Sequence, residues 1–239
     1  MKNLILTTAL LALTSGFAAA QTIRMGTEGA YPPYNFINDA GEVDGFEREL
    51  GDELCARASL TCEWVTTDWD GIIPNLQSGN YDTIIAGMSI TAEREEVIDF
   101  TQNYIPPAYS AYIALDAGVD VTGVVAAQTG TIQAGHVQET GATLVEFATP
   151  DETVAAVRNG EADAVFADKD YLAPIVTESG GQFAWAGKDV QLGGGIGLGL
   201  RASDTELKAK FNDAITAMKA DGTLNTLILK WFGDEAATF

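Results

Sequence analysis

The chain has 239 residues and is 46% hydrophobic, enough to pack one large or two modest domains and too much for a disordered chain. Its 13 Lys and Arg against 34 Asp and Glu give a formal net charge of −21. This charge excludes nucleic acids and anionic membranes as expected partners. It is compatible with plain solubility and with the approach of a cationic ligand.

Residues 1–20 predict a signal peptide. Lys2 supplies the positive start, residues 4–13 are mostly apolar, and three alanines end at Ala20, where we expect cleavage. No later run approaches the roughly 20 apolar residues of a membrane-spanning helix. We therefore expect an exported, soluble protein whose mature charge, without Lys2, is 12 − 34 = −22.

Residues 23–26 predict a short strand, and residues 27–34 a loop rich in Gly, Pro and Tyr. Prolines end the strand and fix the shape of the loop. The loop would present Glu28 and Tyr31 at the end of the strand. The alternatives are a surface glutamate and a core tyrosine.

Residues 45–58 have a helical period, residues 62–65 predict a strand and residues 72–79 a second helix. Trp69 follows that strand as Tyr31 follows the first, so it is either a core residue or a platform for a ligand. Cys55 and Cys62 close a short loop. Export permits a disulfide between them, two free buried thiols are the alternative, and a metal site is disfavoured because the chain's single histidine is distant in sequence.

Residues 81–100 predict a strand (83–86), a tight turn (Gly87 to Ser89) and a helix capped by Thr91. Arg94 is the lone cation in an acidic first helical turn. Open α/β sheets bind ligands at the carboxyl ends of their strands. We therefore predict that this turn forms half of an amino-acid site, with Arg94 holding the carboxylate of the ligand. Three successive strand–helix units indicate a parallel sheet.

Residues 109–115 and 121–127 predict strands of a second lobe, and the turn at 128–131 leads into a helix. Such a turn offers free backbone N–H groups to a carboxylate, although many helices begin this way. After a helix at 153–160 and a strand at 164–167 comes Asp168. It either caps the next helix or faces an ammonium group across a cleft.

Residues 193–200 are rich in glycine but contain no GxGxxG, so we expect a returning strand, no nucleotide site and no cofactor. A helix then begins at Ser203 or Asp204 and ends at Gly222, and a final helix holds residues 224–231. The sequence suggests two lobes joined by two crossings that act as a hinge. The expected first lobe is 21–108 with 198–239, and the second is 109–197.

Several segments in this order resemble the periplasmic polar-amino-acid-binding proteins of ABC importers, nearest to the lysine/arginine/ornithine, histidine and octopine/nopaline binders. They are residues 26–36, 45–58, 69–94, 128–131, 160–168 and 221–233. The resemblance implies an α/β fold of the type II periplasmic-binding-protein class, a periplasmic monomer, a membrane permease as partner, no catalytic residues and no metal. It also implies a Cys55–Cys62 disulfide.

The resemblance implies a role for each site residue. Arg94 pairs with the ligand carboxylate, helped by the backbone at Ser89 and Thr131. Asp168 and the carbonyl near Gly87 take the α-ammonium group. Tyr31 and Trp69 sandwich the side chain of the ligand. Glu28 is the acid that faces the cationic group at the end of that side chain.

Two departures from the family pattern leave the ligand open. Ala86 and Gly87 stand where basic-amino-acid binders often have two serines, and the chain is short before Val124, where opine binders tend to carry an insertion. We predict arginine, ornithine or lysine, with an opine, glutamine or histidine as the alternative. A cyclohexadienyl dehydratase-like enzyme, with Glu28 as its general acid, and a solute sensor are the other hypotheses.

Overall fold

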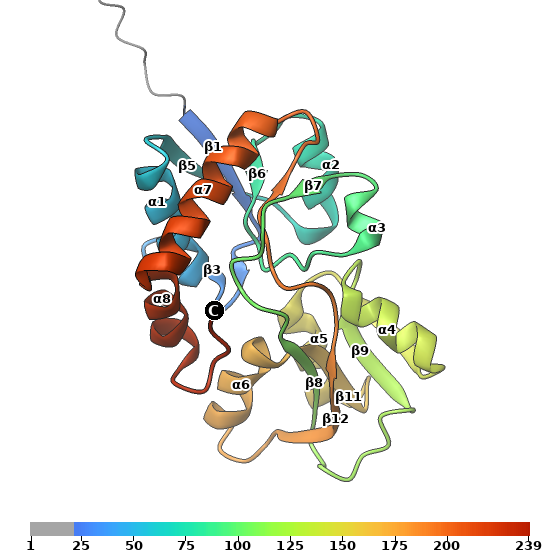
Figure 1. Cartoon of the computed structure of the whole chain (residues 1–239). Helices are drawn as coiled ribbons and strands as arrows, with labels where there is room; N and C mark the ends of the chain where they lie inside the picture. The colour runs from blue at the N-terminus through green and yellow to red at the C-terminus, as the bar shows by residue number, and fades with distance from the viewer. Residues whose placement is uncertain (1–21) are drawn as a thin grey trace, which may run out of the picture.

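The computed structural model describes residues 22–239, so the predicted signal peptide lies outside the described part of the chain. Two five-stranded sheets form the centres of two α/β lobes, and a three-stranded sheet accompanies the first (Figure 1). Within residues 22–239, no helix has the length and apolar character needed to cross a bilayer.

The first sheet has the strand order β5-β1-β6-β13-β7. Its strands are β5 (Thr61–Thr66), β1 (Thr22–Thr27), β6 (Thr83–Ile84), β13 (Gly199–Leu200) and β7 (Asp99–Phe100). β1 runs parallel to β5 and β6, as the strand–helix units predict. β13 runs antiparallel to β6 and β7, because the returning chain enters between them in the opposite direction, so the complete sheet is mixed.

Helices cover the first sheet because each presents an apolar stripe to it. They are α1 (Phe46–Arg57), α2 (Ile72–Gln77), α7 (Thr205–Asp221) and α8 (Thr223–Phe232). Phe46, Leu50 and Leu54 of α1 are fully buried with Phe211 and Ile215 of α7 in one core. The short helix α3 (Ala92–Glu95) begins at the predicted cap, where the Thr91 hydroxyl accepts a hydrogen bond from the backbone N–H of Arg94 at 3.2 Å.

Residues 30–44 form a small sheet that the sequence did not predict. Its strands are β2 (Ala30–Tyr31), β3 (Asn35–Ile37) and β4 (Val43–Asp44), paired antiparallel. Each is two or three residues long, too short for a period to be recognised in the sequence. Trp69 likewise lies in a short 3₁₀ turn, η1 (Trp69–Gly71), rather than in an irregular loop.

The second sheet has the order β10-β9-β11-β8-β12. The strands are β10 (Thr143–Phe147), β9 (Val124–Gln128), β11 (Ala164–Asp168), β8 (Tyr109–Ala114) and β12 (Ala184–Gln191), and the helices are α4 (Ile132–Thr140), α5 (Pro150–Asn159) and α6 (Lys169–Glu178). β10 and β12 were missed because half or more of their residues are partly exposed and interrupt the apolar pattern. α5 begins earlier than predicted because Thr149 and Glu152 form a capping box.

Two crossing segments, residues 101–108 and 192–198, connect the sheets and run side by side (Figure 1). The Tyr104 N–H donates to the Ile196 carbonyl at 2.7 Å, and the Ile196 N–H donates to the Ile105 carbonyl at 3.0 Å. A paired link of this kind can bend without separating the lobes. The lobe boundaries drawn from the sequence remain a prediction, although the strands of each sheet fall within them.

The disulfide is confirmed: Cys55 of α1 is bonded to Cys62 of β5. With a sequence separation of 7 it closes a short loop. Reduction is expected to lower the free energy of unfolding by about 2.5 kcal/mol, because the open loop gains entropy in the unfolded chain. Urea denaturation with and without reductant measures this change. A Cys55→Ala, Cys62→Ala variant is the control, and equal midpoints for oxidised and fully reduced protein would contradict the prediction.

Candidate functional site

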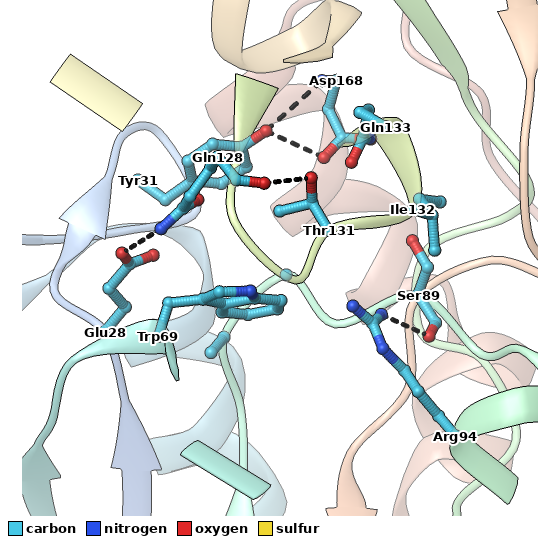
Figure 2. Close-up of a pocket in the computed structure, with 12 residues that line it drawn as sticks. Glu28, Tyr31, Trp69, Ser89, Arg94, Gln128, Thr131, Ile132, Gln133 and Asp168 are labelled. Carbon is cyan, nitrogen blue, oxygen red and sulfur yellow. Dashed lines mark hydrogen bonds between the residues drawn. The ribbon is translucent and has the colours of Figure 1, made fainter. Parts of the chain in front are cut away.

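A cavity lies between the two lobes, and the space around it that protein atoms leave empty, open solvent included, is about 330 Å³. It is lined by Glu28, Tyr31, Trp69, Ala86, Gly87, Ser89, Arg94, Gln128, Thr131, Ile132, Gln133 and Asp168 (Figure 2). All eight residues that the sequence analysis selected for ligand binding are among them. No ligand contact was expected from the sequence for Gln128, Ile132 or Gln133, and Ala86 was considered only as a departure from the family pattern.

The lining residues stand at the ends of strands from both sheets. Glu28 follows β1, Gly87 and Ser89 follow β6, Gln128 ends β9, and Asp168 ends β11. Parallel strands of an α/β sheet expose turn residues at their carboxyl ends, and here those ends face one cavity. The local pattern of strand followed by turn is therefore what delivers polar side chains to this place.

Arg94 enters the cavity, and it has no carboxylate partner within 4.0 Å among residues 22–239. Its Nη1 donates to the Ser89 carbonyl at 2.9 Å and its Nη2 to the Gly130 carbonyl at 3.3 Å. The guanidinium carbon lies 5.4 Å from the ring centroid of Trp69. Burial lowers the pKa of Arg94 to about 10, against the opposing effect of the Asp168 charge. A guanidinium has five donors, so it retains capacity for an anion.

The backbone around Arg94 adds to this capacity. The Ser89 N–H has no hydrogen-bond acceptor among residues 22–239. Ser89 pairs antiparallel with Ile196, but the hydrogen bonds of this pairing are donated by the N–H groups of Ile90 and Gly197. Thr131 caps α4, because its hydroxyl accepts from the Ala134 N–H at 3.1 Å. These groups surround one end of the cavity with donors, which is the arrangement a carboxylate needs.

Asp168 carries the negative charge at the other lobe. Its Oδ2 accepts from the Tyr31 hydroxyl at 2.8 Å, and its Oδ1 accepts from Gln133 Nε2 at 2.9 Å. Burial raises the pKa of Asp168 to about 6, and the bond from Tyr31 is the largest opposing effect. Asp168 stands at the N-cap position of α6, but its side chain makes no capping hydrogen bond and contacts Tyr31 and Gln133 instead.

Glu28 and Gln128 connect the lobes at the far end of the cavity (Figure 2). Gln128 Nε2 donates to Glu28 Oε1 at 2.6 Å and to the Ala148 carbonyl at 3.1 Å. Burial raises the pKa of Glu28 to about 7, while the bond from Gln128 acts in the opposite direction. A polar residue ending a buried strand was the available sign that Gln128 belongs to the site.

The two aromatic rings contact different partners. Tyr31 stacks on Tyr171 with centroids 4.4 Å apart and planes 12° apart, while its hydroxyl reaches Asp168. Trp69 is 9% exposed and faces Arg94. Both line the cavity, and their action as a sandwich around a ligand side chain remains a prediction.

Comparison with known proteins bears on the whole chain and its fold. A model of the bacterial extracellular solute-binding proteins, family 3, matches residues 23–234. The lysine/arginine/ornithine-binding periplasmic protein of Escherichia coli is 31% identical over 253 residues, covering 97% of each chain.

Solved structures of binding proteins also resemble this chain in fold. A periplasmic His/Glu/Gln/Arg/opine family-binding protein from Silicibacter pomeroyi, in complex with lysine, is 76% identical with a TM-score of 0.90, covering 91% of this chain and 100% of that one. An ancestral amino acid-binding protein, a precursor of cyclohexadienyl dehydratase, is 30% identical with a TM-score of 0.79, covering 88% of this chain and 95% of that one.

Proposed function

This chain belongs to the bacterial extracellular solute-binding proteins of family 3, and we propose that it is a periplasmic receptor for a basic L-amino acid. Lysine, arginine or ornithine is held between the lobes and delivered to the membrane permease of an ABC importer. The receptor acts as a monomer, and its export depends on the predicted signal peptide.

One observation carries the proposal. Arg94 from the first lobe and Asp168 from the second line the same cavity, and neither has an oppositely charged side chain within 4.0 Å in the described chain. Removing a charge from water is costly unless an opposite charge or hydrogen bonds compensate it. An α-amino acid supplies both partners at once, the carboxylate for Arg94 and the ammonium for Asp168.

The arrangement favours binding in two steps. The ligand first meets the first-lobe groups: Tyr31, Trp69, Ser89 and Arg94. Bending at residues 101–108 and 192–198 then brings Asp168 and the Thr131 turn over it. Exclusion of water strengthens each charge pair, so a plain amine or a plain acid should bind far more weakly than the zwitterion.

Calorimetry against a panel of ligands tests the proposal. Lysine, arginine and ornithine are titrated beside glutamine and histidine. Cadaverine, which lacks the α-carboxylate of lysine, and 6-aminohexanoate, which lacks its α-amine, serve as analogues. Binding of a basic amino acid and not of the analogues supports the proposal. A neutral amino acid as the tightest ligand would overturn the choice of side chain, and no amino-acid binding would overturn the function.

Glu28 supports the choice of a basic side chain, as does the lysine bound to the Silicibacter pomeroyi relative. The Glu28→Gln variant keeps the shape of the side chain and removes its charge. We expect lysine affinity to fall at least about tenfold, because a desolvated charge pair is lost. Glutamine affinity should change little. Calorimetry with both ligands measures the selectivity, and equal losses for both would contradict the role of Glu28.

The affinity for lysine is also expected to depend on pH. A cationic ligand favours ionised Glu28, whose pKa of about 7 lies above its ordinary 4.5 without ligand. Binding therefore releases a proton below about pH 7, and affinity rises as pH increases toward that value. The stability of the free protein changes in the opposite direction. As pH rises from 4.5 to about 7, Glu28 ionises while it is buried, and this lowers the free energy of unfolding. Calorimetry in buffers of different ionisation enthalpy measures the released proton, and its absence would contradict this assignment.

A dehydratase activity is the rival from another class, favoured by the relation to a dehydratase precursor and by the raised pKa of Glu28. A protonated carboxyl at neutral pH is suited to act as a general acid. Incubation with prephenate or arogenate, followed by detection of the aromatic product, distinguishes an enzyme from a receptor. A sensor that reports the ligand to a signalling partner would use the same site.

A further inference from the structure

Glu47 is a buried carboxylate that does not line the cavity. It lies in the first turn of α1, is 0% exposed, and forms no ion pair within residues 22–239. Burial raises its pKa, and hydrogen bonds from its neighbours act in the opposite direction. A buried acid without a cation is costly, so its hydrogen bonds must explain its presence.

Three donors reach Glu47 from three separate segments. Gly87 donates its N–H to Oε1 at 2.7 Å, and Asn35 Nδ2 donates to Oε2 at 2.7 Å. The Tyr104 hydroxyl also donates to Oε1. Gly87 belongs to the cavity, Asn35 to the small sheet after the Glu28 loop, and Tyr104 to a crossing segment.

Asn35 extends this network to the Glu28 loop. Its Oδ1 accepts from the Gly29 N–H at 2.7 Å, while its Nδ2 faces Glu47. The orientation of the amide is thereby fixed, because turning it over would set Nδ2 against the N–H of Gly29. One carboxylate thus connects the residue after Glu28 with the Gly87 turn and with the hinge.

We infer that Glu47 is a positioning residue for ligand binding. It fixes the Gly87 turn relative to the Glu28 loop and ties both to the crossing that holds Tyr104, so the first-lobe half of the cavity is formed before the ligand arrives. Preformed donors and acceptors spare the ligand the cost of ordering them. This inference rests on the proposed function, since its effect is read as affinity for a basic amino acid.

The Glu47→Gln variant tests the inference. If the new amide oxygen accepts from Gly87 and Tyr104, its NH₂ group opposes Asn35 Nδ2, which cannot turn over. Because every placement leaves two donors facing one another, we expect lysine affinity to fall at least about tenfold. The matched control is Glu53→Gln, which removes a carboxylate from the same helix where it pairs with Arg57, and should leave the affinity unchanged.

A second substitution exchanges the donor and acceptor roles of residues 35 and 47 and so restores complementary hydrogen bonds. In the double variant Asn35→Asp, Glu47→Gln, the new carboxylate at 35 accepts from the Gly29 N–H and from the new amide. The oxygen of that amide still accepts from Gly87 and Tyr104. Lysine affinity is expected to return to within about threefold of wild type, as a coupled pair in a mutant cycle requires. The Asn35→Asp change alone opposes two carboxylates and should weaken binding.

Two readouts separate positioning from loss of stability. Affinity is measured by calorimetry well below the melting temperature of each variant, and the Gly87 amide resonance is followed by NMR in the free protein. We expect this resonance to shift in Glu47→Gln and to return in the double variant. Wild-type affinity in Glu47→Gln, or a double variant that binds no better than it, overturns the inference.

Folding failure does not remove the test. If Glu47→Gln does not fold, a folded double variant with near-wild-type affinity supports the inference, and an unfolded one overturns it. Wild-type protein that binds no amino acid would instead refute the proposed function. The Gly87 resonance would still test the network by its shift and recovery, because it requires no ligand.

Discussion

Replacing Arg94 with alanine is expected to lower the affinity for every α-amino acid at least about 100-fold, because the ligand carboxylate would be buried without its cation. The loss should be common to basic and neutral ligands, since the carboxylate is common to them. Isothermal titration calorimetry with lysine and glutamine measures it. Arg94 already donates to the Ser89 and Gly130 carbonyls, so its guanidinium is held in place before the ligand arrives.

Two further variants give this prediction its specificity. Arg94→Lys keeps the charge but loses the planar fork of donors, so its affinity should lie between those of wild type and Arg94→Ala. Arg48→Ala removes an arginine that pairs with Asp52 on α1, remote from the cavity, and should bind as wild type does. Wild-type affinity in Arg94→Ala would show that the carboxylate binds elsewhere.

The second large effect is expected for Asp168→Asn, again a loss of at least about 100-fold, because the ligand ammonium loses its buried counter-charge. The substitution keeps the shape of the side chain and its place beside Tyr31 and Gln133. Calorimetry with lysine and with its des-amino analogue, 6-aminohexanoate, separates the contribution of the ligand ammonium group to affinity from the contributions of the other ligand groups. Wild-type affinity in Asp168→Asn would falsify the assignment.

The same carboxylate predicts its own contribution to the pH dependence of binding, separate from that of Glu28, and the variant should abolish this contribution. Burial raises the pKa of Asp168 to about 6, above its ordinary 3.8, so the free protein binds a proton there more readily than the unfolded chain does. Below about pH 6 the ligand ammonium must displace this proton, and affinity falls. Asp189→Asn, which breaks an exposed pair with Lys169 in the same lobe, is the control and should retain the pH dependence.

Local signals in the sequence predict which segments bear the site. A strand followed by a turn fixes where Glu28, Gly87 and Asp168 stand, because strand length and turn residues are encoded within a few positions. The Thr91 cap, the disulfide and the chain's return at residues 193–200 were available from the same kind of signal, with the family resemblance supplying the disulfide pairing.

The contacts of each polar side chain depend on how distant segments pack together. Gln128 meets Glu28 across 100 residues of sequence, and Tyr31 reaches Asp168 across 137. The direction of β13 and the three donors around Glu47 also depend on segments distant in the chain. Hydrophobic period and turn composition describe a segment's own shape, whereas these contacts arise from how separate segments pack, and no spacing within either segment encodes that.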